Sequence, residues 1–314
     1  MRFLLILITG LAALLITPGE ALAWGPGVHT VTANWVLQNL TALPPAVADV
    51  LMRYPGFFIQ GCLSADIFIG KGSVAKKGHS HNWDAGFTLL ARAVKDRDKA
   101  YAYGYLAHLA ADTVAHNVFV PGLFEGAPGS GRLAHVYLEI QADRILRWDS
   151  RDARGVFHQQ GSRRANVLLR DSMSQKAFRF WLKTHVFEGS IALGGSKVWR
   201  GSMRLFDRLL PEQLRRQLVE QMLTISTRAV ISVLNDFEKS PVMSLDPIGA
   251  DALATAMQER NGKSVLLRGV ADKIRRAVAG TGTPALTEKL EEPTLIIPEA
   301  LAAFPPVCTT NKGM

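Results

Sequence analysis

Residues 98–119 read DKAYAYGYLAHLAADTVAHNVF, and this stretch carries the strongest helical pattern in the chain. Residues four apart on a helix differ by about 40° around its axis, so His108, Asp112 and His116 form one stripe. Small residues on the same helix would let a facing helix approach closely: Ala107, Ala110, Ala111 and Ala115. Two imidazoles and a carboxylate are ligands that zinc prefers, but a packed core histidine beside a surface aspartate would give the same pattern.

A second predicted helix offers a matching pair of side chains. In His135-Val-Tyr-Leu-Glu139 an imidazole and a carboxylate lie four residues apart and so share one helix face. Helical bundles build metal sites from side chains on facing helices of this kind. Asp143 lies one turn further on, and we expect it to be an exposed acid paired with Arg144 or Arg147 rather than a carboxylate that holds an imidazole.

Other candidate ligands lie between the N-terminal region and these helices. Asp66 occurs in GCLSADIF, His79 and His81 occur in GHSHNWD, and His29 lies further upstream. Six of the eight histidines of the chain therefore belong to one constellation with acidic residues. This clustering favours a metal site over chance.

The pattern of apolar residues predicts an all-α class, because they recur at three- and four-residue intervals and no stretch alternates clearly like a strand. Expected helices cover about 29–40, 45–53, 84–95, 98–119, 132–148, 163–188, 211–236 and 247–279. Loops rich in Gly or Pro are expected at 70–78, 121–131 and 189–195. The predicted architecture is a multi-helix, bundle-like domain with a metal cluster between helices and a helical C-terminal appendage.

The first 23 residues have the features of a signal peptide. One basic residue precedes an apolar run from Phe3 to Ile16, and Ala21-Leu22-Ala23 then gives an A-x-A cleavage site. The run is shorter than the ~20 residues that span a bilayer, which disfavours an uncleaved anchor. We therefore expect cleavage after Ala23 and a secreted or periplasmic protein.

The composition is that of a globular protein, with 48% hydrophobic and 20% charged residues. A net charge of +9 favours anionic partners such as phospholipid surfaces or nucleic acid, although a solvated basic surface is an equally good interpretation. The two cysteines, Cys62 and Cys308, could form a disulfide in an exported chain. The sequence alone leaves that pairing open.

Taken together, these residues resemble the zinc-dependent phospholipases C of bacteria and, more distantly, the fungal single-strand-specific zinc nucleases. Proteins of both families are all-helical and begin, after processing, with a tryptophan that binds zinc through its free amine and its carbonyl oxygen. Here Trp24 directly follows Ala23. The resemblance covers roughly residues 24–150. The sequence changes character after Pro241, so we expect the catalytic domain over 24–240, followed by a helical appendage and irregular tail of unknown role over 241–314.

The resemblance also implies a set of ligands for three zinc ions. The first ion would be bound by Asp66, His81, His108 and Asp112. The second would be bound by His116, His135 and Glu139. The third would be bound by Trp24, His29 and a bridging Asp112. His81 is preferred to His79 as a ligand because Ser80-His81-x-x-Asp84 matches a Ser-His-x-x-Asp segment of the family.

The sequence departs from the family pattern in two respects. His116 follows Asp112 by four residues, whereas the best-known bacillus-type enzymes have a gap of six, although a gap of four keeps both side chains on one helix face. Residues that would hold the lipid headgroup find no match, and no lipid-binding β-sandwich follows. The headgroup therefore stays open.

The predicted function is a secreted zinc-dependent phosphodiester hydrolase of the phospholipase C type. A zinc-bound hydroxide would attack phosphorus, Asp66 would accept its proton as the catalytic base, and diacylglycerol would leave. An extracellular nuclease or other phosphodiesterase is the alternative: the Trp24-Gly-Pro-Gly-Val-His29 start favours a nuclease and Glu139 a phospholipase. A non-catalytic zinc-binding protein is a third possibility. Expected partners are the phosphodiester substrate and, transiently, a membrane surface, with no stable protein partner.

Overall fold

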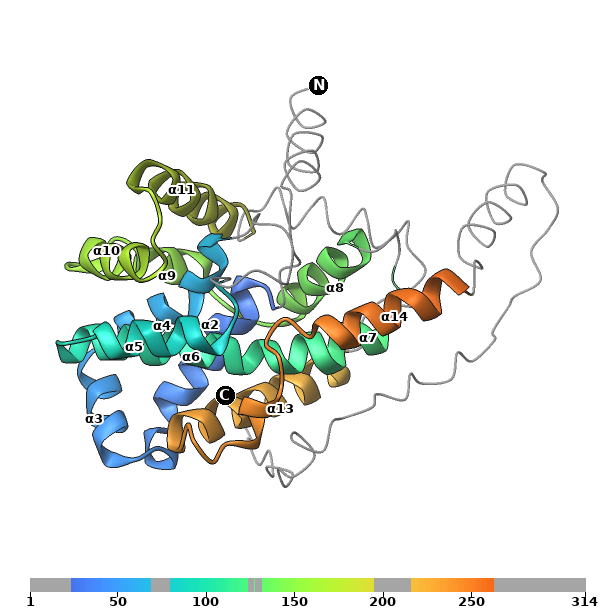
Figure 1. Cartoon of the computed structure of the whole chain (residues 1–314), viewed down its shortest axis with the longest axis horizontal. Coiled ribbons are helices and arrows are strands. Elements are labelled where there is room, and N and C mark those ends of the chain that lie inside the picture. The colour runs from blue at the N-terminus through green and yellow to red at the C-terminus, as the bar shows by residue number, and fades with distance from the viewer. Residues whose placement is uncertain (1–23, 69–79, 124–126, 128–131, 195–215, 263–314) are drawn as a thin grey trace.

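The structure, a computed structural model, describes residues 24–68, 80–123, 127, 132–194 and 216–262 (Figure 1). Within these ranges the chain forms helices and no β-strand, which confirms the predicted all-α class. None of the described helices combines the length and hydrophobicity needed to cross a bilayer. The predicted signal peptide, His79 and Cys308 lie outside the described residues.

The described helices follow one another with short connections. In chain order they are α2 (Pro26–Gln38), η1 (Leu40–Ala42), α3 (Pro45–Arg53), α4 (Pro55–Ser64), η2 (Ala65–Phe68), α5 (Trp83–Arg92), α6 (Asp96–Val114), η3 (Ala115–Phe119), α7 (Val120–Leu123), α8 (Arg132–Ile145), α9 (Ser150–Gly155), α10 (Ser162–Ser172), α11 (Ala177–Gly194), α13 (Arg216–Asn235), η4 (Pro241–Ser244) and α14 (Ala250–Gly262). Proline opens α2, α3 and α4, where its fixed φ suits the first turn and its missing N–H costs no hydrogen bond.

Helix α6 runs through the centre of the molecule, with α13 on one side of it and α8 and α11 on the other in Figure 1. Its sequence explains this position, because the helix itself carries small and apolar residues on all its faces. From Ala100 to Val114 it is buried, with the exception of Tyr103. The helix packs against α2, α3, α4, α5 and α13. The predicted stripe of His108 and Asp112 therefore lies in the core.

Two glycines bring α4 and α6 unusually close together. A Cβ atom on Gly61 would lie 2.0 Å from the carbonyl oxygen of Tyr101, and one on Gly104 would lie 2.1 Å from that of Phe58. Such distances are impossible for any residue with a side chain, so this backbone contact requires glycine on both helices. The alanines of α6 are buried as expected, but the closest approach of a facing helix occurs at Gly104.

The sequence-based helix predictions are wrong in several places, among them the short helices α7, which begins the stretch expected as a loop over 121–131, and α9, which was not expected. Helix α4 was not expected, because apart from Gln60 its residues are apolar or small and it therefore lacks an amphipathic period. The helix expected over 163–188 is broken near Ser174, whose φ of 50° lies in the left-handed region and ends α10. Residues 189–194, expected in a loop, complete α11 instead.

The segment that follows residue 240 packs directly on the end of α6. The indole of Trp83 donates to the carbonyl of Leu245 at 2.9 Å, and the side-chain amide of Asn117 donates to that of Asp246 at 2.9 Å. Helix α14 then contacts η3 and α7. These contacts tie residues 241–262 to the part of the chain that carries the candidate ligands.

Candidate metal centre

His108 projects from α6 with its ring orientation fixed by α4. Its Nδ1 lies 2.7 Å from the carbonyl oxygen of Cys62, and because a carbonyl only accepts hydrogen bonds, Nδ1 must carry the proton. The lone pair on Nε2 then points into the interior, as a metal ligand requires. The close approach at Gly61 and Gly104 makes this contact possible.

His81 occupies the short segment before α5 and is held from three directions. Asn82 caps α5 by accepting a hydrogen bond from the backbone N–H of Ala85 at 2.7 Å. Ser80 Oγ lies 3.0 Å from His81 Nδ1, and the hydroxyl of Tyr105 on α6 donates to the Ser80 carbonyl at 2.5 Å. The ring is thereby turned so that Nε2 faces Asp66 and His108.

Four ligand atoms converge beside α6. His81 Nε2 lies 3.2 Å from Asp66 Oδ1, 3.2 Å from His108 Nε2 and 3.7 Å from Asp112 Oδ2. His108 Nε2 lies 3.6 Å from Asp66 Oδ1 and 3.0 Å from Asp112 Oδ2. A tetrahedral zinc ion with ligands at 2.0–2.2 Å separates its ligand atoms by about 3.3 Å. The ligand atoms of His81, His108 and Asp112 all lie within 4.8 Å of one another, as do those of His29, Asp66 and His108, so each trio is close enough to share an ion.

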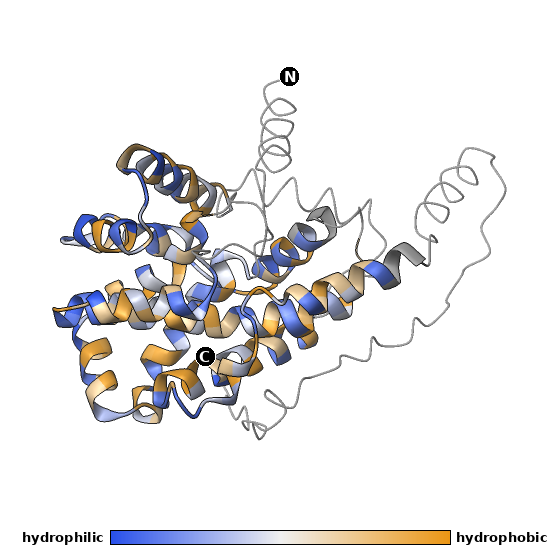
Figure 2. Ribbon diagram, in the orientation of Figure 1, coloured by the Kyte–Doolittle hydropathy of each residue, from blue (hydrophilic) through white to orange (hydrophobic). Residues whose placement is uncertain are grey.

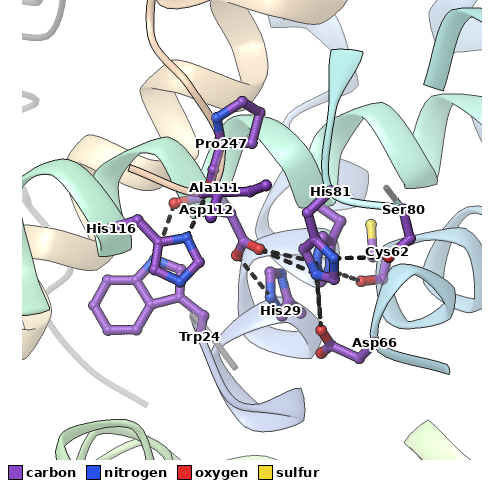
Figure 3. A network of polar contacts seen from close by, with 12 residues as sticks. Trp24, His29, Cys62, Asp66, Ser80, His81, Ala111, Asp112, His116 and Pro247 are labelled. Atoms are coloured by element: carbon purple, nitrogen blue, oxygen red, sulfur yellow. Dashed lines mark hydrogen bonds and ion pairs between the residues drawn. The ribbon is translucent and has the colours of Figure 1, made fainter. Parts of the chain in front are cut away.

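Asp112 faces two groups of side chains with its two oxygens. Oδ2 points toward His108 and His81, whereas Oδ1 lies 3.2 Å from His29 Nε2. The His29 ring, from α2, stacks on His108 with a centroid distance of 3.9 Å. Figure 3 shows the carboxylate of Asp112 between the imidazoles of His29 and His81, with Asp66 on the far side. This placement suits a carboxylate that bridges two ions.

Trp24 is fully buried where the described chain begins. Its indole Nε1 lies 3.1 Å from the Ala111 carbonyl and 3.1 Å from Ser226 Oγ, and its ring lies 4.5 Å from that of Phe119. Ala111 directly precedes Asp112 on α6. The start of the described chain is therefore anchored beside the turn of α6 that carries Asp112 (Figure 3).

His116 lies where α6 widens into the π-helical turn η3, a distortion that is frequent at functional sites. Its Nδ1 lies 2.6 Å from the carbonyl oxygen of Pro247, which again assigns the proton to Nδ1 and turns Nε2 inward. Gly249 permits this contact, because its φ is +60° and a Cβ there would lie 2.4 Å from the His116 carbonyl oxygen. Residues 247–249 thus orient a candidate ligand.

Helix α8 brings His135 and Glu139 to the same interior. Both side chains are buried, and His135 Nε2 lies 3.0 Å from Glu139 Oε1. The rings of His116 and His135 meet edge to face with centroids 5.2 Å apart. The structure therefore brings together the three residues predicted to share one ion.

Asp143, also on α8, binds the beginning of α2. Its carboxylate accepts hydrogen bonds from the backbone N–H groups of Gly27 and Val28, each at 2.9 Å. Burial raises its pKa to about 7 even though these two hydrogen bonds oppose the shift. The expectation of an exposed acid is wrong, because Asp143 is a partly buried residue that fixes the helix turn preceding His29.

The centre concentrates negative charge away from solvent. Asp66, Asp112 and Glu139 are each 1% exposed or less. Within the described part of the chain, the carboxylates of these residues contact histidine rings and form no ion pair with Lys or Arg. Oxygen atoms of all three, and Nε2 of His116, are buried without a hydrogen-bond partner. Burying such groups unpaired costs several kcal/mol, so the donor set fits a cluster of divalent cations.

The pKa shifts reflect the same crowding of charge. Burial would raise the pKa of Asp112, but His108 and His29 hold it well below its usual range. Burial raises the pKa of Glu139 well above its usual range, and the charges of Asp66, Asp112 and Asp143 add to this shift. Burial lowers the pKa of His116 and so favours its neutral, ligating form. A bound cation would stabilise the ionised Glu139.

Fold and site together define an all-helical protein with a buried cluster of imidazoles and carboxylates suited to several divalent ions. A family model described as zinc-dependent phospholipase C matches residues 28–188, slightly more than half of the chain. The chain belongs to this family and is a zinc-dependent phosphodiester hydrolase of the phospholipase C type. No curated protein and no solved structure matches it.

The side chains that meet in this centre were predicted as ligands from the sequence, whereas the groups that orient them were not. The backbone carbonyls of Cys62 and Pro247 carry no sequence pattern of their own, since every residue has one. The sequence also assigned no role to the hydroxyl of Tyr105, which donates to the carbonyl of Ser80. Its position one turn before His108 was the signal that could have placed it near the site. Cys62 itself is buried in α4.

Proposed function

We propose that this protein is an exported phospholipase C in which three zinc ions occupy the buried centre. The observation that carries the proposal is the set of buried oxygen and nitrogen atoms on Asp66, Asp112, Glu139 and His116 that lack hydrogen-bond partners. The chain that carries these atoms belongs to a family described as zinc-dependent phospholipases C, which cleave phosphodiesters. The substrate is a phospholipid, and the products are diacylglycerol and a phosphorylated headgroup.

The proposed ion positions follow the three clusters of side chains. Asp66, His81, His108 and Asp112 would hold the first ion, and the close spacing of His81, His108 and Asp112 and the distances of Asp66 to the two imidazoles support this assignment. His116, His135 and Glu139 would hold the second. Trp24, His29 and Asp112 would hold the third, with Asp112 shared. When bound, zinc supplies Lewis acidity that neutralises phosphoryl oxygens and allows water to act as a nucleophile near neutral pH.

Asp66 has the geometry of a residue with two tasks. Its Oδ1 lies within 3.2 Å of His81 Nε2 and 3.6 Å of His108 Nε2, whereas its Oδ2 is buried without a hydrogen-bond partner. One oxygen is thus placed to bind metal and the other to accept a proton. We therefore assign Asp66 as the general base that deprotonates the attacking water.

Replacing Asp66 by Asn should separate these two tasks. The amide keeps one oxygen for metal binding but cannot accept a proton, so turnover should fall by about 10²–10⁴-fold while most of the zinc stays bound. Steady-state hydrolysis and metal analysis of the same preparation measure both effects. Asp152→Asn, the same change at an exposed acid in helix α9, is the matched control and should leave both unchanged. Wild-type turnover in the Asp66 variant would remove this residue from the mechanism.

Export would also complete the site. Cleavage after Ala23 makes Trp24 the first residue and frees its α-amine for metal binding. The position of Trp24 supports this step, because its indole is anchored to the turn of α6 that carries Asp112. The destination, secreted or periplasmic, follows from the N-terminal sequence alone.

A further inference from the structure

Helix α11 presents an apolar stripe to solvent. Phe178, Trp181, Leu182 and Val186 are exposed to 72%, 52%, 48% and 61%. Their spacing of three and four residues places them on one face of the helix. Figure 2 shows hydrophobic residues along much of α11, which lies at the edge of the molecule. Contiguous exposed apolar patches mark interaction sites.

The opposite face of α11 already packs on the protein. The Phe180 ring lies 5.7 Å from that of Phe68, the Phe187 ring lies 6.0 Å from that of Phe157, and Ile191 is fully buried. The helix is therefore apolar on both faces, whereas a helix that only covers a core would be polar on its outer face. The stripe of Phe178, Trp181, Leu182 and Val186 is not explained by folding.

Aromatic rings within the stripe form a continuous ladder. Phe178 stacks on Trp181 with centroids 6.1 Å apart, and Trp181 lies 4.4 Å from His185. Trp and His combine an apolar body with a polar edge, which suits a position between the headgroups and acyl chains of a lipid layer. A ladder of this kind is pre-arranged to insert into such a layer.

Basic residues lie beside the stripe at the start of α11. Lys176 and Arg179, on either side of Phe178 in the sequence, are both exposed. Residues 150–194 contain eight Lys and Arg against three Asp and Glu. An apolar stripe flanked by positive charge is complementary to an anionic lipid surface, to which each cation adds attraction.

The stripe also lies close to the metal centre. On the inner side of α11, Lys183 donates to the carbonyl of Phe68 at 3.3 Å, and Phe68 ends η2, the helical turn that carries Asp66. A helix with its side chains is about 10 Å across, so a lipid surface against the stripe would lie roughly that far from this turn. A lipid surface docked on the stripe would therefore place phospholipid substrate close to the metal centre.

We propose that the outer face of α11 docks this protein on anionic phospholipid surfaces. The inference rests on the proposed phospholipase function, because the docked surface contains the substrate. The apolar stripe enters the interface, the aromatic ladder lies at headgroup level, and Lys176 and Arg179 contact the anionic headgroups. Docking is reversible and is distinct from metal binding and from the chemistry of the centre.

The test is co-sedimentation of the zinc-loaded protein with vesicles of phosphatidylcholine mixed with phosphatidylglycerol, on ice, so that binding is read before hydrolysis. Val186→Asp places a charge in the stripe and should weaken vesicle binding about tenfold or more. Val94→Asp makes the same change at a position 84% exposed outside α11 and should bind as the wild type does. Both variants should hydrolyse a short-chain, monomeric phospholipid at the wild-type rate.

A second pair of variants separates docking from folding. Trp181→Ala removes the centre of the ladder, and the double change Lys176→Glu and Arg179→Glu reverses the flanking charge without touching an apolar contact. Each should weaken binding to the mixed vesicles, and the charge reversal should matter less for vesicles of phosphatidylcholine alone. Circular dichroism that matches the wild type would show that the fold is intact.

Three results would overturn the docking proposal. One is wild-type vesicle binding by Val186→Asp and Trp181→Ala. Another is a dimer in gel filtration that Val186→Asp separates, which would assign the stripe to a second copy of the chain. The third is preferential binding of the wild type to single-stranded DNA over lipid. By contrast, stripe-dependent vesicle binding without hydrolysis of any phospholipid would keep the docking surface and contradict the proposed phospholipase activity.

Discussion

Replacing Asp112 by Asn is expected to abolish most of the activity and to remove at least one metal ion. The carboxylate faces His29 with one oxygen and His108 with the other, and both atoms are buried without a hydrogen-bond partner. The amide nitrogen of Asn cannot bind a cation, so one of the two contacts is always lost. Hydrolysis should fall by about 10⁴-fold, which corresponds to about 5 kcal/mol of transition-state stabilisation.

A control on the same helix shows whether the effect is specific to the centre. Asp98 is also buried in α6, but it lies in the first turn, beside Arg97 and Arg164. Asp98→Asn should leave the zinc content and the hydrolysis rate unchanged, with at most a small loss of thermal stability. Wild-type zinc content in Asp112→Asn would contradict a bridging role for this residue.

A chain with one extra residue before Trp24 is expected to lose the zinc ion nearest His29 while keeping the others. An added residue converts the α-amine into an amide, whose nitrogen lone pair is delocalised into the carbonyl and does not bind metal. The remaining ions should still support weak hydrolysis, reduced by about 10²-fold, or about 3 kcal/mol. Metal analysis and kinetics on the extended and the processed chain measure both effects.

Trp24→Phe in a correctly processed chain separates the amine from the side chain. This variant keeps the free α-amine but loses the hydrogen bonds of the indole to Ala111 and Ser226. Its zinc content should equal that of the wild type, although its thermal stability should fall. If the extended chain instead binds the full complement of zinc, the amine is not a ligand.

The sequence predicted the central helix of this fold well because its chemistry is carried by side chains with helical spacing. His108 and Asp112 lie four residues apart on α6, and the structure buries both at the point where α2, η2 and the segment before α5 deliver other candidate ligands. The all-α class was predicted from a different pattern. Apolar residues that recur every three or four positions indicate helices with one buried face.

Features that depend on tertiary contacts could not be predicted in this way. Helix α4 has no polar face, and its pairing with α6 depends on the coincidence of Gly61 and Gly104. The contact between Pro247 and His116 joins residues 131 positions apart through a backbone carbonyl. Asp143 accepts hydrogen bonds from backbone N–H groups at the start of α2. No local pattern on α8 indicates this contact.

We expect the buried centre to bind zinc and to cleave a phospholipid. The most direct test is metal analysis of the chain that begins at Trp24, combined with assays on a panel of phospholipids, single-stranded DNA and an aryl phosphodiester. We predict three zinc ions and release of diacylglycerol from at least one phospholipid, lost on chelation and restored by zinc. A chain without bound zinc, or one that cleaves DNA and no phospholipid, would contradict this account.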